Sequence, residues 1–301
     1  MTMNILVTGA SGLVGSALVP FLSSHAHRVI RLVRTGPKPG AEEILWDPEA
    51  GWLDPVSLDG LDAVVHLAGE SIASGRWTLA RKGRILDSRA NGTRLLARTL
   101  AAVKRAPKVL VSTSAVGYYG DRGAEILREE SGPGSGFLTE VCRQWEQAAR
   151  EVTERGIRLV VLRLGMILSS AGGALPRMLP PFRLGAGGPL GSGNQYVSWI
   201  ALGDLLAIVL FALADPSLQG VVNAVAPNPA TNREFARTLG RVLKRPAMIP
   251  VPAFAIRLLF GEMGEQVLLA SSRVEPTRLI AAGFQFRYPD LETALRHELA
   301  R

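Results

Sequence analysis

The sequence contains little that could bind a metal or form a disulfide. Its 301 residues include one cysteine, Cys142, and four histidines that are scattered along the chain. A single cysteine cannot form an intramolecular disulfide, and histidines without neighbouring ligands do not build a metal site. We therefore expect no bound metal, and a reducing compartment such as the cytoplasm.

Long apolar runs and dense runs of one charge are also missing. The longest uninterrupted apolar run, residues 205–214, is about half as long as a membrane-spanning helix. The first residues lead directly into a β-rich segment, which predicts no signal peptide. The net charge is +8, but the basic residues are scattered and accompany no nucleic-acid-binding pattern. We expect neither membrane nor nucleic acid as a partner, and the positive charge favours an anionic cofactor or substrate.

Short β-rich runs alternate with helical patterns along the first half of the chain. This alternation predicts an α/β fold with a doubly wound parallel sheet. Glycine- and proline-rich segments follow, and then further strands and helices, including a helix over 232–243 behind an N-cap at Thr231. We expect one globule with two interleaved parts, a doubly wound domain in residues 1–165 and a smaller α/β substrate lobe in residues 166–301. The first part is expected to hold strands at 4–8, 29–33, 43–46, 62–68, 109–112 and 159–163, and helices from residue 13, over 77–103 and over 140–152.

A glycine-rich turn joins the first strand to the first helix. It reads Thr8-Gly9-Ala10-Ser11-Gly12-Leu13-Val14-Gly15. In such a turn Gly9 permits the tight bend, Gly12 lets the backbone approach a pyrophosphate, and Gly15 lets the helix pack on the sheet. The free N–H groups at the start of the helix then bind phosphates. The pattern predicts a Rossmann dinucleotide site with contacts from Gly9, Ser11, Gly12, Leu13 and Val14.

The end of the second strand indicates which dinucleotide binds. A fold that prefers NAD has an Asp or Glu there, which accepts hydrogen bonds from the adenosine ribose. Here the position holds Val33, and Arg34 follows. A guanidinium forms paired charge-assisted hydrogen bonds with a 2′-phosphate, so Arg34 favours NADP(H), with Arg31 or Lys38 as helpers. The alternative is that Arg34 is a solvated loop residue.

Two further segments are expected beside the cofactor. Leu67, Ala68 and Gly69 end the strand at 62–68, and small residues at the carboxyl end of a strand leave room for the adenosine. Arg89 lies in the helix over 77–103, from which a cation can reach phosphate or ribose oxygens. The alternatives are a plain strand end for the first segment and an exposed ion pair for Arg89.

These strings together resemble an atypical branch of the extended short-chain dehydrogenase/reductases. TGxxGxxG is the fingerprint of that family. Residues 89–93 are similar to its NVxGT helix, with Arg89 in place of the asparagine, and residues 111–120 are similar to its SSxxVYG segment. Strings at 67–70, 187–193, 198–200 and 232–235 resemble the subfamily usually labelled "epimerase family protein". The resemblance covers nearly the whole chain, and it allows a homodimer.

The resemblance also implies a catalytic pair that this chain lacks. The family uses a Tyr and, four residues later on the same helix face, a Lys that lowers the pKa of the phenol and holds the nicotinamide ribose. If Glu146 is aligned with the glutamate that usually follows, the two positions hold Leu138 and Cys142. Neither side chain can perform that chemistry.

Other polar groups are then candidates for the reaction. Ser114 matches the catalytic serine of the family, and Tyr118 and Tyr119 are expected at the mouth of the cleft, with Tyr119 the better match to the family's tyrosine. We predict that Ser114 polarises a carbonyl and that one of these tyrosines transfers the proton. The alternative is that the three residues only complete hydrogen bonds at the end of a strand.

Two functions remain open from the sequence. Val197 and Ser198 replace a charged pair that nucleotide-sugar enzymes of the family carry, which makes a nucleotide-diphosphate sugar doubtful. We expect an NADP(H)-dependent oxidoreductase or epimerase-like enzyme for a small carbonyl or hydroxyl compound. Gln195, Trp199 and Arg273 are candidates for the lining of the cleft, and for Trp199 a core position is the favoured alternative. The alternative, also implied by the resemblance, is a non-catalytic NADP(H)-binding regulatory protein of the type associated with cell division.

Overall fold

A mostly parallel sheet forms the centre of the molecule. The computed structural model describes residues 2–36 and 38–300. Eight strands make one sheet in the order β12-β8-β6-β5-β1-β2-β3-β4, and its neighbouring strands run parallel except for β3 and β4. The strands are β1 (Asn4–Thr8), β2 (Arg28–Val33), β3 (Glu43–Asp47), β4 (Trp52–Leu53), β5 (Ala63–His66), β6 (Val109–Ala115), β8 (Arg158–Leu164) and β12 (Gly220–Ala224).

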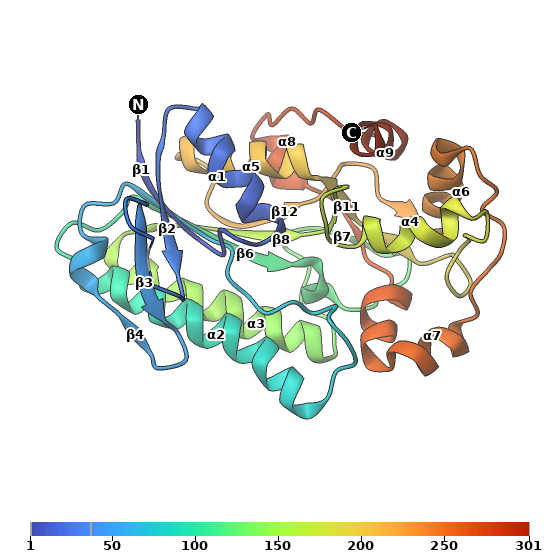
Figure 1. The fold of residues 1–301 in the computed structure, drawn as a ribbon, viewed down its shortest axis with the longest axis horizontal. Coiled ribbons are helices and arrows are strands. Elements are labelled where there is room, and N and C mark those ends of the chain that lie inside the picture. Colours follow the sequence, from blue (N-terminus) through green and yellow to red (C-terminus); the bar gives the residue numbers. More distant parts are fainter. Residues whose placement is uncertain (1, 37, 301) are drawn as a thin grey trace.

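Helices cover both faces of this sheet. Helices α1 (Leu13–Ser24) and α5 (Leu202–Ala214) lie on one face, and α2 (Leu79–Ala102) and α3 (Phe137–Arg150) lie on the other (Figure 1). Successive side chains of a strand point to opposite faces, so Ile5 packs in the core beneath α1 and α5, whereas Leu6 packs in the core beneath α2. Two covered faces explain why the strands read as continuous apolar runs.

The strand order reverses between β1 and β5. From β1 the chain continues to β2 and β3 on one side, while β5, β6 and β8 follow on the other. The crevice at the carboxyl ends of strands at such a reversal is where open α/β sheets bind ligands. The glycine turn leaves β1 at this point.

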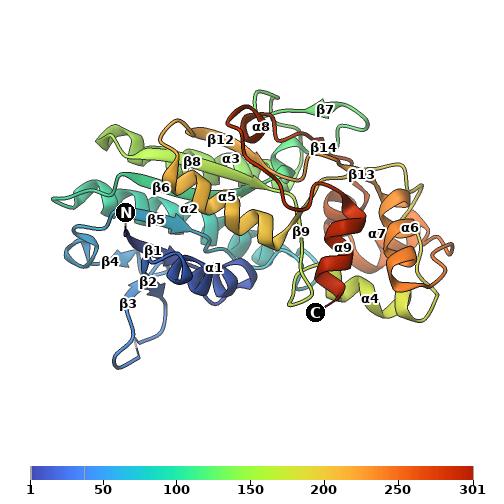
Figure 2. The same cartoon turned by 90° about the horizontal axis from the view of Figure 1, so that it is seen from above.

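The second half of the chain completes the sheet and builds a lobe beside it. Strand β12 pairs with β8, so the sheet includes residues beyond 165; the boundary expected there stays a prediction. Helices α4 (Leu175–Arg183), α6 (Asn232–Leu243), α7 (Ala253–Phe260) and α9 (Leu291–Leu299) gather at one end of the molecule (Figure 2). The remaining α-helix is α8 (Thr277–Ala281), and the remaining short strands are β7 (Ile126–Leu127), β9 (Met166–Leu168), β10 (Tyr196–Val197), β11 (Trp199–Ala201), β13 (Ala230–Thr231) and β14 (Arg273–Val274). Short helical turns are η1 (Pro55–Leu58), η2 (Val116–Tyr119), η3 (Glu151–Arg155) and η4 (Gly264–Leu269).

The structure confirms the α/β doubly wound class and the main expected elements. The helix predicted over 232–243 is α6, and Thr231 caps it: the Thr231 hydroxyl accepts from the N–H of Glu234 at 3.2 Å, and the Glu234 carboxylate accepts from the N–H of Thr231 at 2.8 Å. Helix α2 begins at Leu79, two residues later than expected, because Thr78 is its N-cap. Within residues 2–36 and 38–300, no helix is both long and apolar enough to cross a membrane.

Candidate functional site

The glycine turn has the shape that a dinucleotide requires. Gly9 has a φ of +64°, and a Cβ there would lie 2.8 Å from the carbonyl carbon of Leu67. A Cβ on Gly15 would overlap the carbonyl oxygen of Gly9, so α1 packs against the turn more closely than a side chain allows. Gly12 is exposed. Within the described residues, a Cβ on Gly12 would come close to one atom, the carbonyl oxygen of Gly9, at 3.3 Å. The fold therefore requires Gly9 and Gly15, whereas Gly12 leaves space outside the fold for a ligand.

Buried side chains hold this turn against β5 and α2. The Thr8 hydroxyl oxygen accepts from the N–H groups of Leu67 and Ala68, at 3.0 and 3.1 Å, and its own proton therefore goes to Nδ1 of His66, at 2.8 Å. Nε2 of His66 then carries the ring proton and donates to the Thr93 hydroxyl at 2.8 Å. Burial lowers the pKa of His66 to about 4. A neutral histidine thus joins the turn, the strand and the helix.

The sequence alone does not reveal this role of His66. A histidine in a buried strand resembles an ordinary core residue, and its two threonine partners lie 58 and 27 residues away along the chain. The segment 67–69 lies beside the glycine turn, and two of its N–H groups bind Thr8. Its contact with adenosine stays a prediction.

Arg34 lies at the end of β2 with its guanidinium uncommitted. The side chain is exposed and has no hydrogen bond or ion pair with any residue of the described ranges. Its expected helper Arg31 pairs instead with Glu43 at 2.7 Å, and that same carboxylate accepts from the backbone N–H of Lys38 at 2.7 Å. The guanidinium of Arg34 therefore remains able to bind a phosphate, and so does the exposed ammonium of Lys38, which has no partner among the described residues.

Ser114 belongs to a buried network of polar side chains. At the end of β6, its hydroxyl donates to Glu146 of α3 at 2.8 Å. Arg163 of β8 donates to both oxygens of the same carboxylate, from Nε and Nη2, each at 2.8 Å. The side chains of Glu146 and Arg163 are each 3% exposed, so water does not screen this pair. The proton of Ser114 faces Glu146, and the hydroxyl must turn before it can donate to a substrate.

Tyr119 does not lie at the mouth of a cleft, and the expected placement is wrong. The residue is 0% exposed. Its hydroxyl accepts from Arg163 at 2.9 Å and lies 2.8 Å from the amide oxygen of Asn223 and 3.0 Å from the carbonyl oxygen of Arg128. Burial raises the pKa of the phenol. Arg163 and Asn223 lie on β8 and β12, and Arg128 directly follows β7, so the proton of Tyr119 stays within the protein.

Tyr118 is the more accessible of the two tyrosines. Its ring lies over the guanidinium of Arg163, with 3.4 Å between Cζ and the ring centroid. The ring is partly exposed, and its hydroxyl makes no hydrogen bond within the described part of the chain. Tyr118 also lines a groove of about 460 Å³ along α3, together with Arg143 and Arg150. Of the two, it is the tyrosine that can reach a ligand.

Leu138 and Cys142 lie on α3, where the family has its catalytic pair. The backbone N–H of Leu138 donates to the side chain of Gln266, from η4, at 3.0 Å. Cys142 is buried, its thiol donates to the carbonyl oxygen of Ala115 at 3.7 Å, and burial raises its pKa to about 11. A protonated thiol and a leucine provide neither a general acid nor a cation at these positions.

The residues expected to line the substrate side differ in their placement. Trp199 is completely buried, and its indole N–H donates to the carbonyl oxygen of Asn228 at 3.1 Å, so it is a core residue. Gln195 is also buried, where its amide holds two backbone carbonyls. Arg273 lies over the ring of Tyr196, with 4.9 Å between Cζ and the centroid. The core position that the sequence favours for Trp199 over the cleft is confirmed.

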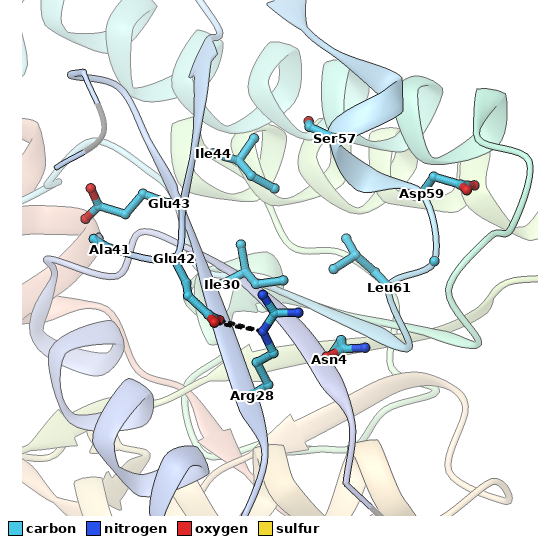
Figure 3. Close-up of a pocket in the computed structure, with 11 residues that line it drawn as sticks. Asn4, Arg28, Ile30, Ala41, Glu42, Glu43, Ile44, Ser57, Asp59 and Leu61 are labelled. Atoms are coloured by element: carbon cyan, nitrogen blue, oxygen red, sulfur yellow. Dashed lines mark hydrogen bonds and ion pairs between the residues drawn. The ribbon is translucent and has the colours of Figure 1, made fainter. Parts of the chain in front are cut away.

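A hollow of about 470 Å³ lies at the opposite end of the sheet, near the amino ends of β1, β2 and β3 (Figure 3). Arg28 and Glu42 form an ion pair of 2.8 Å across it. Asp59, at its rim, pairs with Arg105 at 3.2 Å. The charges that face this hollow already have partners, and it lies away from the glycine turn. It is therefore not the dinucleotide site.

Two family models match the sequence. The model of the NAD dependent epimerase/dehydratase family matches residues 5–224. This chain belongs to that family. A domain of unknown function, DUF1731, matches residues 251–298, which lie in the lobe beside the sheet.

Relatives extend over the full length of the chain. The epimerase family protein MT2273 of Mycobacterium tuberculosis is 42% identical over 297 residues, which cover 99% of this chain and 98% of the relative. The human epimerase family protein SDR39U1 is 39% identical over 301 residues, which cover 99% and 100%. These matches confirm the resemblance stated above.

Solved structures agree with the same assignment. A crystal structure of human SDR39U1 (isoform2) with NADPH has a TM-score of 0.90 and 38% identity, and covers 99% of this chain and 100% of that one. A nucleoside-diphosphate sugar epimerase from Corynebacterium glutamicum has a TM-score of 0.82 and 38% identity, over 99% of this chain and 58% of that one.

Proposed function

We propose that this protein binds NADP(H) at the glycine turn and exchanges hydride between it and a small carbonyl or hydroxyl compound. The observation that carries the proposal is the uncommitted guanidinium of Arg34 at the end of β2, where an NAD-preferring protein has a carboxylate. The open space beside Gly12 fits a pyrophosphate. The NADPH in the structure of the human relative supports the same choice.

The residues of the chain have separate tasks in this proposal. The N–H groups at the start of α1 bind the pyrophosphate, and Arg34 binds the 2′-phosphate. The bound cofactor supplies or accepts the hydride. Ser114 turns from Glu146 toward the substrate oxygen and polarises it, and Tyr118 is the nearby phenol able to transfer the proton, since Tyr119 is enclosed.

The cofactor part is tested by comparing Arg34→Ala with the wild type for binding of NADPH and NADH. Loss of a charge-assisted contact of about 1.5–3 kcal/mol raises the Kd for NADPH about 10- to 100-fold. The Kd for NADH is expected to stay unchanged. The matched control is Arg155→Ala, which removes an exposed arginine of η3. Equal affinity of the wild type for both cofactors would contradict the proposal.

A specific observation also favours the second candidate, a non-catalytic NADP(H)-binding regulatory protein. The catalytic positions hold Leu138 and Cys142, and the proton of Ser114 is engaged by Glu146. A panel of small carbonyl and hydroxyl compounds, followed by NADPH fluorescence, separates the two candidates. Turnover that Ser114→Ala abolishes supports the enzyme. Tight NADPH binding without turnover of any compound in the panel supports the regulatory protein.

Two tyrosine variants, Tyr118→Phe and Tyr119→Phe, are compared with Ser114→Ala to test which phenol takes part in turnover. Tyr118→Phe is expected to reduce turnover without changing thermal stability, because its hydroxyl has no partner in the described structure. Tyr119→Phe is expected to lower the stability, because its hydroxyl binds Arg163 and Asn223 in the interior. Undiminished turnover in both Ser114→Ala and Tyr118→Phe would reject this assignment of the site.

A further inference from the structure

Large apolar side chains are exposed at the end of the molecule that carries α4, α6 and α7, opposite the end with β3 and β4 (Figure 1). The exposed fraction ranges from 56% for Ile249 to 84% for Leu184. Single exposed apolar residues are common on proteins, but a group of them marks a surface that binds something. We call this group the end patch; its members are Leu184, Met248, Ile249, Phe254, Leu258 and Leu259.

The first half of the end patch is built where two loops run side by side. The backbone N–H of Ile249 donates to the carbonyl oxygen of Gly187 at 3.2 Å. Nε of Arg245 donates to the carbonyl oxygen of Arg183 at 3.1 Å. The loop after α4 therefore lies along the loop between α6 and α7. Folding thus brings exposed apolar residues from two distant segments into one region of the surface.

Helix α7 supplies the second half of the end patch and is apolar on its outer side. Ile256 faces the interior: it is 1% exposed, and its Cγ2 would lie 2.9 Å from a Cβ on Gly264. Phe254 and Leu258 are four residues apart, so they share a face of the helix, and both are exposed. A surface helix usually directs polar residues outward. The outer face of α7 is instead one that needs an apolar partner.

The two segments that carry the end patch contain basic residues and no acidic ones. Residues 171–203 and 235–261 include no Asp or Glu. Arg183, Lys244 and Arg245 are neighbours of the exposed apolar residues in the chain and are themselves exposed. None of these three cations forms an ion pair within the described part of the chain.

The acidic residues that follow α7 already have partners. Glu262 binds Nζ of Lys82 at 2.8 Å, and Glu265 lies 3.4 Å from Nε of Arg257. They therefore leave the cations of the two loops without compensation. The end patch combines exposed apolar side chains with uncompensated positive charge, and an occupant has to suit both.

This combination distinguishes two kinds of occupant. In an interface between two copies of the same face, a two-fold axis would bring the cations of one copy toward the cations of the other. Arg183, Lys244 and Arg245 have no carboxylate beside them to relieve that repulsion. An anionic lipid surface offers phosphates to the cations and an apolar layer to the Phe and Leu side chains.

We propose that the end patch docks this protein on the surface of a bilayer that contains anionic phospholipids. Met248, Phe254 and Leu258 enter the interfacial layer, and Arg183 and Lys244 bind lipid phosphates. The sequence predicts no membrane partner because it has no apolar run long enough to span a bilayer, but a patch assembled from separate segments contains no such run. Docking is independent of the proposed NADP(H) binding.

Cosedimentation with phosphatidylcholine vesicles, with and without about 30% phosphatidylglycerol, tests the proposal. The wild type is expected to bind the anionic vesicles about tenfold or more tightly than the neutral ones, and to dissociate as the salt concentration rises. Phe254→Ser/Leu258→Ser should weaken binding to the anionic vesicles about tenfold or more. The matched control, Val56→Ser/Ile280→Ser, removes exposed apolar side chains of η1 and α8 and should bind like the wild type.

A second pair of variants tests the charge separately. Arg183→Gln/Lys244→Gln should weaken binding to the anionic vesicles about tenfold or more and leave binding to the neutral ones unchanged. Lys104→Gln/Arg155→Gln removes the same charge from exposed positions elsewhere and should behave like the wild type. All the substituted side chains are exposed, so thermal unfolding should be unchanged and checks that each variant is folded.

The contrary outcomes are equally specific. The proposal is refuted if the wild type fails to bind the anionic vesicles or binds both kinds equally, or if folded Phe254→Ser/Leu258→Ser binds them undiminished. A second copy as occupant gives another result: sedimentation equilibrium would detect a dimer that this variant dissociates, without binding to vesicles, and that would overturn the proposal. A failure of NADP(H) binding would refute the proposed function and leave these measurements unaffected.

Discussion

Replacing His66 by glutamine should reduce the dependence of stability on pH. The folded protein holds His66 neutral with a pKa of about 4, whereas an unfolded chain binds the proton near the ordinary value of 6.5. Between these values the unfolded state binds more protons, so stability is lost as the pH falls from about 6.5 toward 4. At about 1.4 kcal/mol for each tenfold change in proton affinity, the full loss due to His66 is about 3 kcal/mol.

Urea unfolding at pH of about 7 and about 4.5 measures this loss, of which about 2 kcal/mol falls in that interval. His66→Gln cannot take up a proton, so its loss of stability over the interval should be about 2 kcal/mol smaller than that of the wild type. His25→Gln, which changes an exposed histidine at the end of α1, is the matched control and should behave like the wild type. A pH dependence of His66→Gln that equals the wild type would refute the reasoning.

Three further predictions concern the turn, the buried ion pair and a helix cap. Gly12→Ala should keep the melting temperature but weaken NADPH binding. Gly15→Ala should lower both the melting temperature and the NADPH affinity, because its Cβ would overlap the Gly9 oxygen. An unchanged melting temperature of Gly15→Ala would contradict the packing described. Arg163→Met should lower the free energy of unfolding in urea by about 3–5 kcal/mol, because it leaves Glu146 buried without its cation. The double variant Arg163→Met/Glu146→Leu should lose less stability than Arg163→Met, and additive losses would argue against this. Thr231→Ala should cost about 1 kcal/mol, and no change would mean that the cap is dispensable.

Local sequence signals were sufficient for the glycine turn and for the cap of α6. The spacing of Gly9, Gly12 and Gly15 after a buried strand predicted the turn, and the structure shows a positive φ and a close backbone approach where the pattern requires them. The cap at Thr231 was equally predictable, because its partner Glu234 is three residues away. In each of these cases the residues that decide the conformation are neighbours in the chain.

Contacts between distant residues were not predictable in this way. The hydroxyl of Tyr119 binds partners that are 44 and 104 residues away, on β8 and β12, and only the assembled sheet brings them together. A family pattern placed Tyr119 at the cleft, because the pattern records the residue type and not its hydrogen bonds. The contact between Arg89 and Gly69 likewise depends on how α2 packs beside the end of β5.

The separation of the cation from α3 indicates how this site differs from the family pattern. A tyrosine and lysine pair on one helix joins cofactor binding and proton transfer, since the lysine serves both. Here α3 carries Leu138 and Cys142, while the uncommitted guanidinium of Arg34 lies at the end of β2. If Arg34 holds the 2′-phosphate as proposed, cofactor binding is retained without the group that lowers a phenol pKa. Cofactor affinity and catalytic rate would then depend on different residues, and variants of Arg34 and Tyr118 should affect them separately.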